Sequence, residues 1–167
     1  MTPAVRIGIA CSVLTGVLLA GCGVSDEAVR RIVHEELAAA GGRSYHAPTT
    51  VIGPYSPAVK AGPLVFVSGQ IALVSATGAM VQSDIEAETR QVLANVRTVL
   101  ASAGCDSSDV VSATVYLKDM NTYQRVNAVY AGFFPPGKYP ARVAVEVSRL
   151  PKDANVEISV IAVKSAK

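Results

Sequence analysis

The order of strand-like and helix-like segments constrains the fold of this chain more than any other feature. From about residue 50 to the C-terminus the order is strands, helix, strand, helix and two strands. The helical segments are 83–104 and 121–134, and the last two strands lie within 140–148 and 156–163. Because two helices can cover only one face of a single sheet, this order predicts an α+β fold built as a two-layer sandwich.

Both predicted helices carry signals for their first residues. In the first helix, Ser83 is followed three residues later by Glu86, which is the spacing of a capping box. In the second helix, Asn121 precedes the apolar positions and is a favourable N-cap residue. We therefore expect Ser83 and Asn121 to cap the two helices.

The last predicted strand is apolar on both of its faces. Alternate residues of a strand point to opposite faces of the sheet. The apolar residues of one face are Val156, Ile158, Val160 and Ala162, and those of the other are Ile161 and Val163. Since the helices cover one face only, we expect other copies of the chain to bury the second face in a homo-oligomer.

The first 21 residues are typical of a secretory signal. Arg6 supplies a positive charge, and the apolar run after it is too short to span a bilayer as a helix. The run ends in LAGC, from Leu19 to Cys22, which resembles the lipobox of bacterial lipoproteins. An ordinary membrane helix, or a signal cut elsewhere, is the alternative. On the lipobox interpretation, Cys22 is lipidated and the exported protein is anchored to the outer face of the cell membrane or in the periplasm.

Residues 22–49 are expected to join this anchor to a single domain at 50–167. Ser25 is a candidate N-cap of a short amphipathic helix that ends before Gly41. This helix could be a stalk, a self-associating segment or a helix packed on the domain. The residues after it, up to the domain, have the composition of a linker.

Composition and missing motifs exclude several classes of function. The chain has 15 Lys and Arg against 13 Asp and Glu, without a run of like charges, which argues against a nucleic-acid partner. Ser68 is not in a nucleophile elbow, because Phe66 stands where that motif needs glycine. No phosphate-binding, dinucleotide or zinc motif occurs, and we expect Cys105 to be structural. A serine hydrolase or a metal enzyme is therefore not expected.

Arg142 and Glu157 each place a charge within a run that otherwise has the pattern of a buried strand. Arg142 shares a face with Ala144 and Glu146, so it could be solvated or paired with Glu146. A structural ion pair between Arg142 and Glu157 across neighbouring strands is another alternative. The functional alternative is a guanidinium that binds a carboxylate through two parallel hydrogen bonds, with Glu157 holding or activating a water. Tyr55 in GPYSPAV is a third candidate site residue.

From about residue 50 to residue 163 the chain resembles the Rid family of reactive intermediate deaminases, also called the YjgF family. The motifs that carry the resemblance are GPYSPAV, VSGQI, NVRTVLASAG, VVSATVYLKDM, VNAVYAGFF, PARVAVEV, RLPKDANVEIS and IAV. The resemblance implies a chorismate-mutase-like fold, with a six-stranded sheet and two helices on one face. It also implies a homotrimer with clefts between its subunits.

The resemblance further implies an activity. Members of the RidA type hydrolyse enamines and imines, such as 2-aminoacrylate, to 2-keto acids and ammonia without a cofactor. Carried over by residue, Arg142 binds the substrate carboxylate, Glu157 positions water and Tyr55 belongs to the catalytic cleft. Further substrate-binding positions match Ser68, Asn127 and Ala144. The alternative is a non-catalytic extracytoplasmic module that binds a small carboxylate ligand or a partner in the same cleft.

Overall fold

The computed structural model describes residues 27, 30, 42–49 and 51–164. The chain divides into two units between Gly42 and Arg43, and the second unit is described below. The expected signal segment, Cys22 and the N-terminal helix lie outside the described residues, apart from Glu27 and Arg30, which are helical. Within the described part of the chain, no helix has both the length and the apolar character needed to cross a membrane.

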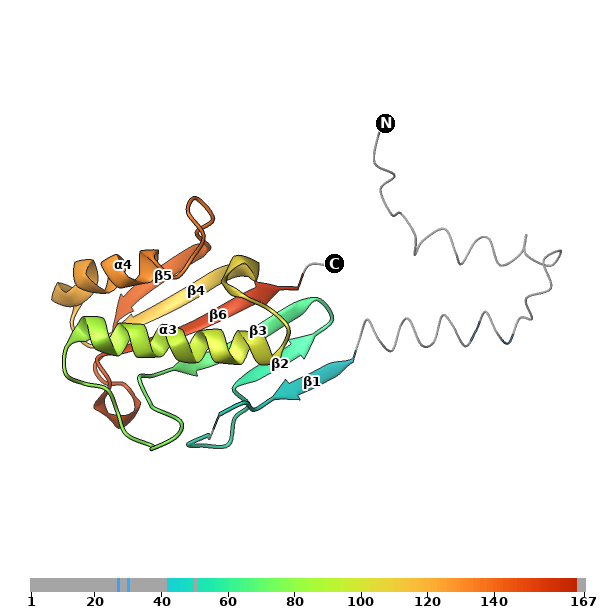
Figure 1. The fold of residues 1–167 in the computed structure, drawn as a ribbon, viewed down its shortest axis with the longest axis horizontal. Coiled ribbons are helices and arrows are strands. Elements are labelled where there is room, and N and C mark those ends of the chain that lie inside the picture. Colours follow the sequence, from blue (N-terminus) through green and yellow to red (C-terminus); the bar gives the residue numbers. More distant parts are fainter. Residues whose placement is uncertain (1–26, 28–29, 31–41, 50, 165–167) are drawn as a thin grey trace. The chain divides into compact units, whose positions relative to one another are not determined.

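The second unit is a six-stranded sheet with two α-helices on one face, which confirms the predicted α+β two-layer fold (Figure 1). The strands follow the order β1-β2-β3-β6-β4-β5 across the sheet. They are β1 (Arg43–His46), β2 (Ala58–Ala61), β3 (Leu64–Gln70), β4 (Val110–Leu117), β5 (Ala141–Glu146) and β6 (Val156–Val163). The helices are α3 (Ile85–Ser102) and α4 (Tyr123–Ala131), with short 3₁₀ turns η2 (Ser107–Asp109), η3 (Met120–Thr122) and η4 (Pro151–Asp153).

Strand β6 lies inside the sheet, between β3 and β4, and is antiparallel to both. Strands β4 and β5 are parallel, because α4 returns the chain to the same end of the sheet before β5 begins. The side chains between the helices and the sheet form the hydrophobic core. Fully buried members from the sheet and α3 include Val65, Val156, Ile158, Leu117, Val92, Val96 and Leu100.

The helix caps differ from those expected from the sequence. The N-cap of α3 is Asp84, whose Oδ1 accepts a hydrogen bond from the N–H of Ala87 at 2.7 Å, so the assignment of Ser83 was wrong. Asn121 is not a helix cap either, because it lies within η3, where its own N–H donates to Oδ1 of Asp119 at 2.9 Å. At α3 the neighbouring aspartate, whose charged carboxylate is the stronger acceptor, fills the capping position, whereas the N-cap of α4 is Thr122, which makes no side-chain capping hydrogen bond.

Residues 43–46 are a strand, not part of a linker. Strand β1 pairs antiparallel with β2, with Arg43 opposite Ala61 and His46 opposite Ala58. The sheet therefore begins at Arg43, seven residues before the boundary expected from composition. Residues 43–46 show no alternation of apolar residues because β1 is an edge strand whose side chains are largely exposed.

The sheet face that the helices leave uncovered, called the open face below, carries exposed apolar side chains. Val143 is 56% exposed and Phe66 is 42% exposed, and both lie on strands whose alternate residues are buried or half-buried on the other face. Ile161 pairs with Phe66 across β3 and β6 and lies on the same face. The apolar pattern on both sides of β6 therefore corresponds to a helix-covered face and an apolar open face.

A buried carboxylate fastens the segment before β6 to α3. Glu88 on α3 is fully buried, and its Oε1 accepts a hydrogen bond from the backbone N–H of Asn155 at 2.7 Å. Its Oε2 accepts a second hydrogen bond from Nδ2 of Asn155 at 2.8 Å. Both donors are satisfied by one side chain, so Glu88 fixes where β6 begins.

We predict that Glu88→Met lowers the free energy of unfolding by about 1–3 kcal/mol, because a side chain of similar size leaves both Asn155 donors without an acceptor. Glu88→Gln is the matched control. Its amide oxygen still accepts from the Asn155 N–H, and a flipped Asn155 amide can accept from its Nε2, so the loss should be smaller. Urea unfolding at one fixed protein concentration measures both. A Met variant as stable as the wild type would contradict this role.

Candidate functional site

Arg142 lies on the helix-covered face of β5 and is held by residues of α4. Its Nη1 donates a hydrogen bond to Oδ1 of Asn127 at 2.7 Å, and its Nη2 donates to the hydroxyl of Tyr123 at 2.9 Å. The guanidinium carbon lies 5.5 Å from the ring centroid of Tyr123 and 4.7 Å from that of Tyr130. These cation–π contacts and hydrogen bonds fix the guanidinium before any ligand binds.

The surroundings of Arg142 shift the pKa values of the two tyrosines that contact it. The hydrogen bond with Asn127 and the charge of Arg142 lower the pKa of Tyr123. Burial raises the pKa of Tyr130 to about 12, and its hydroxyl has no hydrogen-bond partner among the described residues. A cavity of about 350 Å³ adjoins these groups. It is lined by Asn127, Tyr130, Ala131, Tyr139, Pro140 and Arg142, which together with Tyr123 are called the Arg142 half-site below.

Glu157 lies on the open face, in the middle of the sheet. It stands opposite Tyr116 of β4, and its side chain is half-buried. Burial raises the pKa of the Glu157 carboxyl group. A depression of about 220 Å³ surrounds it. The lining residues, called the Glu157 half-site below, are Ile52, Tyr55, Ser68, Gly69, Ile71, Pro151 and Glu157.

An irregularity in the β3–β6 ladder brings the backbone of β3 against Glu157. The register shifts between Val67 and Gln70, at Ser68 and Gly69. Ser68 is fixed by its hydroxyl, which donates to the carbonyl of Ser56 at 2.7 Å. Such a bulge commonly redirects side chains beside functional sites.

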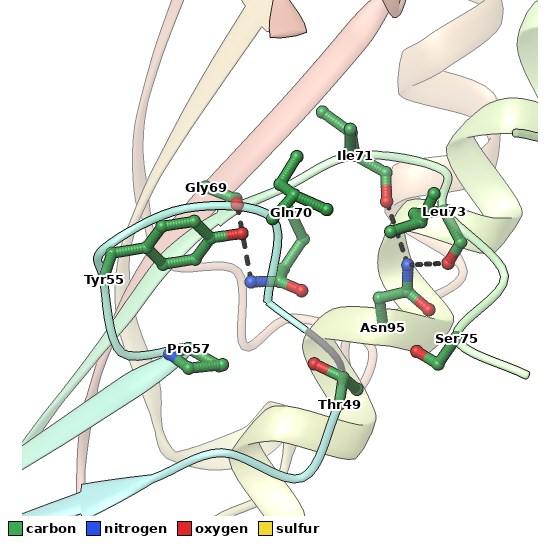
Figure 2. Close-up of a pocket in the computed structure, with 10 residues that line it drawn as sticks. Thr49, Tyr55, Pro57, Gly69, Gln70, Ile71, Leu73, Ser75 and Asn95 are labelled. Carbon is green, nitrogen blue, oxygen red and sulfur yellow. Dashed lines mark hydrogen bonds between the residues drawn. The ribbon is translucent and has the colours of Figure 1, made fainter. Parts of the chain in front are cut away.

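Buried amides hold the bulge and the segment that follows it (Figure 2). Nε2 of Gln70 donates to the carbonyl of Gly69, and Nδ2 of Asn95 donates to the carbonyls of Ile71 and Leu73 at 2.9 and 2.8 Å. Figure 2 shows the ring of Tyr55 lying beside this part of the chain, on the loop that precedes β2. Asn95 therefore ties to α3 the segment after β3, which includes Ile71 of the Glu157 half-site.

Arg142 and Glu157 lie on opposite faces of the sheet, so they do not meet within one copy of the chain. Strands β5 and β6 are both paired with β4 and are not neighbours, which rules out the ion pair across adjacent strands. Pairing of Arg142 with Glu146 is not observed either, because Oε2 of Glu146 accepts the N–H of Met120 and Arg142 donates to Asn127 and Tyr123.

The structure groups the site residues expected from the sequence into two sets. Tyr55, Ser68 and Glu157 are brought together in one half-site, and Arg142 and Asn127 in the other. Ala144 is half-buried and follows Arg142 by two residues on the same face of β5. Cys22 lies outside the described residues.

Sequence reasoning did not find three residues that shape the half-sites. Tyr123 and Tyr130 are spaced four residues before and three residues after Asn127, so all three share one side of α4. Once Asn127 is a candidate site residue, this spacing indicates that Tyr123 and Tyr130 lie beside it. Gly69 has no such signal, because its importance depends on contact with β6.

The described residues contain no group of three or more His, Cys, Asp or Glu placed to hold a metal ion. Cys105 is buried and free, and burial raises the pKa of its thiol. A thiol with a raised pKa is a poor nucleophile at neutral pH. The observed position of Cys105 therefore agrees with a packing role.

Comparison with known proteins gives consistent matches over this unit. The family model described as Endoribonuclease L-PSP matches residues 45–164. A RutC family protein of Pyrococcus horikoshii is 55% identical over 113 residues, covering 68% of this chain and 89% of the relative. Reactive Intermediate Deaminase A, chloroplastic, of Arabidopsis thaliana is 37% identical over 172 residues, covering 96% of this chain and 86% of the relative.

A solved structure shares both the fold and the sequence. The crystal structure of E. coli TdcF with bound serine has a TM-score of 0.66 and 39% sequence identity, and the match covers 73% of this chain and 96% of TdcF. Residues 45–164, which the family model matches, include both half-sites. The chain therefore belongs to the family described as Endoribonuclease L-PSP, which is the Rid, or YjgF, family that its motifs resemble.

Proposed function

We propose that this protein hydrolyses 2-imino acids and their enamine tautomers to 2-keto acids and ammonia, in clefts formed between copies of the chain. The observation that carries the proposal is the pair of half-sites. One presents a fixed guanidinium, and the other presents a half-buried carboxylate, on opposite faces of one sheet. The Arabidopsis relative named Reactive Intermediate Deaminase A supports the same reaction class.

In this proposal Arg142 binds the carboxylate of the substrate. A guanidinium has five N–H donors. The N–H on Nε of Arg142 makes no hydrogen bond within the described chain, and the Nη atoms each retain a further hydrogen. A carboxylate can therefore be bound through two parallel hydrogen bonds while Asn127 and Tyr123 keep the guanidinium in place.

Glu157 then acts as the general base. Its carboxylate takes a proton from a water molecule as the water oxygen attacks C2 of the imine, and the C=N bond becomes a C–N single bond. The nitrogen takes up protons and leaves as ammonia while the C=O bond of the keto acid forms. An enamine enters the same route after protonation at C3. A general base is most effective when its pKa lies near the working pH, and burial raises the pKa of Glu157 in that direction.

The two half-sites favour a ring of copies. If the Arg142 half-site of one copy meets the Glu157 half-site of the next, each interface joins two different surfaces, and such interfaces form a ring when the rotation between copies closes. The exposed apolar side chains of the open face supply area for this contact. Among ring sizes we propose the homotrimer, which is the assembly implied by the family.

We also propose that the lipid on Cys22 anchors the protein to a membrane, at the outer face of the cell membrane or in the periplasm. The proposal rests on the LAGC motif and the apolar run before it. The substrates of the anchored protein would then be imino acids that are exported or formed outside the cytosol.

A second candidate is favoured by the E. coli relative that was solved with bound serine. On this alternative the cleft binds a small carboxylate ligand without turning it over. Release of keto acid from imines made in situ by an amino-acid oxidase, measured above the spontaneous rate, separates the two. If the protein binds a small carboxylate ligand but does not accelerate keto-acid release, the non-catalytic binding function is favoured.

The first prediction concerns the two charged residues. Arg142→Lys keeps the charge but loses the planar fork, so kcat/KM on imino acids should fall by roughly tenfold to a thousandfold.

Glu157→Gln should lower kcat by about a hundredfold with a smaller effect on KM. In the wild type, activity should fall as the pH drops through the raised pKa of Glu157, since the base must be ionised. Folded Glu157→Gln protein with wild-type turnover would exclude this role.

A mixing experiment tests the composite cleft. Arg142→Ala and Glu157→Gln proteins, each nearly inactive, are unfolded together in equal amounts and refolded into mixed trimers. At random mixing, about a quarter of the clefts should hold an intact Arg142 from one copy and an intact Glu157 from its neighbour. Activity should recover to about that fraction of the wild type. No recovery in mixed trimers would contradict a cleft in which Arg142 of one copy works with Glu157 of its neighbour.

The anchor is tested by Cys22→Ser, which should abolish acylation and shift the protein from the membrane fraction to the soluble fraction. The domain should stay folded, because the anchor is expected to form no part of its core. Metabolic labelling with a fatty acid and fractionation without detergent measure the two effects. The expectation fails if wild type and variant are equally labelled and equally soluble.

A further inference from the structure

Gly69 stands where a side chain would collide with the catalytic carboxylate. A Cβ atom built on Gly69 would overlap Oε1 of Glu157, and it would lie 2.7 Å from Cδ and 3.1 Å from Cγ of the same residue. The three atoms nearest to it all belong to the side chain of Glu157. The space that the missing side chain leaves is therefore the space that the Glu157 carboxylate fills.

The backbone at this point has little freedom to move away. The N–H of Ser68 donates to the carbonyl of Pro57 at 2.9 Å, and Nε2 of Gln70 donates to the carbonyls of Ser68 and Gly69 at 3.0 and 3.4 Å. Gln70 is itself buried. A side chain added at position 69 would therefore be accommodated by rotation of Glu157.

Backbone conformation does not explain the glycine. The glycines with left-handed backbone in the described chain are Gly62, Gly78, Gly104 and Gly137, and Gly69 is not among them. An alanine can adopt the backbone conformation of Gly69 without the strain that a left-handed position imposes. The requirement at this position is for space beside Glu157.

We propose that Gly69 is a positioning residue that keeps the carboxylate of Glu157 seated in its half-site, aimed at the cleft. The catalytic consequence rests on the proposed function, whereas the seating of the carboxylate does not. Tyr116 opposite Glu157 on β4 and Tyr55 in the same depression are the titratable side chains next to it on this face.

The test is Gly69→Ala, with Gly132→Ala as the matched control. A Cβ at Gly132 would meet the carbonyl of Val129 at 3.6 Å, which is an ordinary contact, and Gly132 lies outside both half-sites. With imines made in situ by an amino-acid oxidase, Gly69→Ala should lower kcat by about a hundredfold, as loss of the base does, and change KM by a few-fold at most. Gly132→Ala should keep wild-type kinetics.

A second readout does not need the reaction. Carbon NMR of the labelled side-chain carboxyl groups follows the titration of Glu157, whose signal is identified by its loss in Glu157→Gln. In Gly69→Ala the carboxylate moves towards solvent, so the pKa of Glu157 should fall from its raised value towards the ordinary value for glutamate. The titration should be unchanged in Gly132→Ala.

The outcomes separate this inference from the proposed function. Wild-type kcat together with an unchanged Glu157 titration in Gly69→Ala would overturn it. If the wild type hydrolyses no imine, the proposed function fails. The NMR titration of Glu157 then tests by itself whether Gly69 keeps the carboxylate in its half-site. If Gly69→Ala folds poorly, Glu157→Ala in the same chain should restore its melting temperature, because the collision is with Glu157. An equal loss in both backgrounds would also overturn the inference.

Discussion

Side chains alternate across a β-strand, and this alternation decides where the candidate catalytic groups can act. Arg142 on β5 points to the side of α4, and Glu157 on β6 points to the open face, with β4 between the two strands. Rotation of either side chain cannot carry it through a paired sheet. Chemistry that uses both groups must therefore use two copies of the chain, and the apolar open face and the divided site are consequences of the same geometry.

Both half-sites depend on polar contacts with helices that need not touch a ligand. On one side, α4 supplies the two acceptors that hold Arg142. On the other side, α3 supplies Asn95, which holds the segment after β3, and Glu88, which holds the segment before β6. Because buried polar groups are costly when unpaired, these contacts specify one position for each loop, and apolar packing alone would be less selective.

The sequence contains enough to predict the architecture, but less of the site. Helical periodicity located α3 and α4, and strand alternation showed that β6 is apolar on both faces, since both depend only on local spacing. The helix caps were misassigned because the polar residue next to each expected cap, Asp84 or Thr122, is the N-cap instead, and β1 was missed because an edge strand need not alternate. The roles of Tyr123 and Gly69 depend on contacts with β5 and β6 that are distant in sequence, so no local pattern could reveal them.

Charge complementarity explains why one arginine and one glutamate suffice for the proposed reaction. A cleft that combines them carries no net charge, and a 2-imino acid protonated on nitrogen carries one positive and one negative group. The carboxylate end is attracted to Arg142, and the electron-poor C=N end is directed to Glu157 and its water. The keto acid formed retains the carboxylate but has lost the positive nitrogen, so its interaction with Glu157 becomes repulsive or neutral. The same pair of charges thus orients the substrate and favours release of the product.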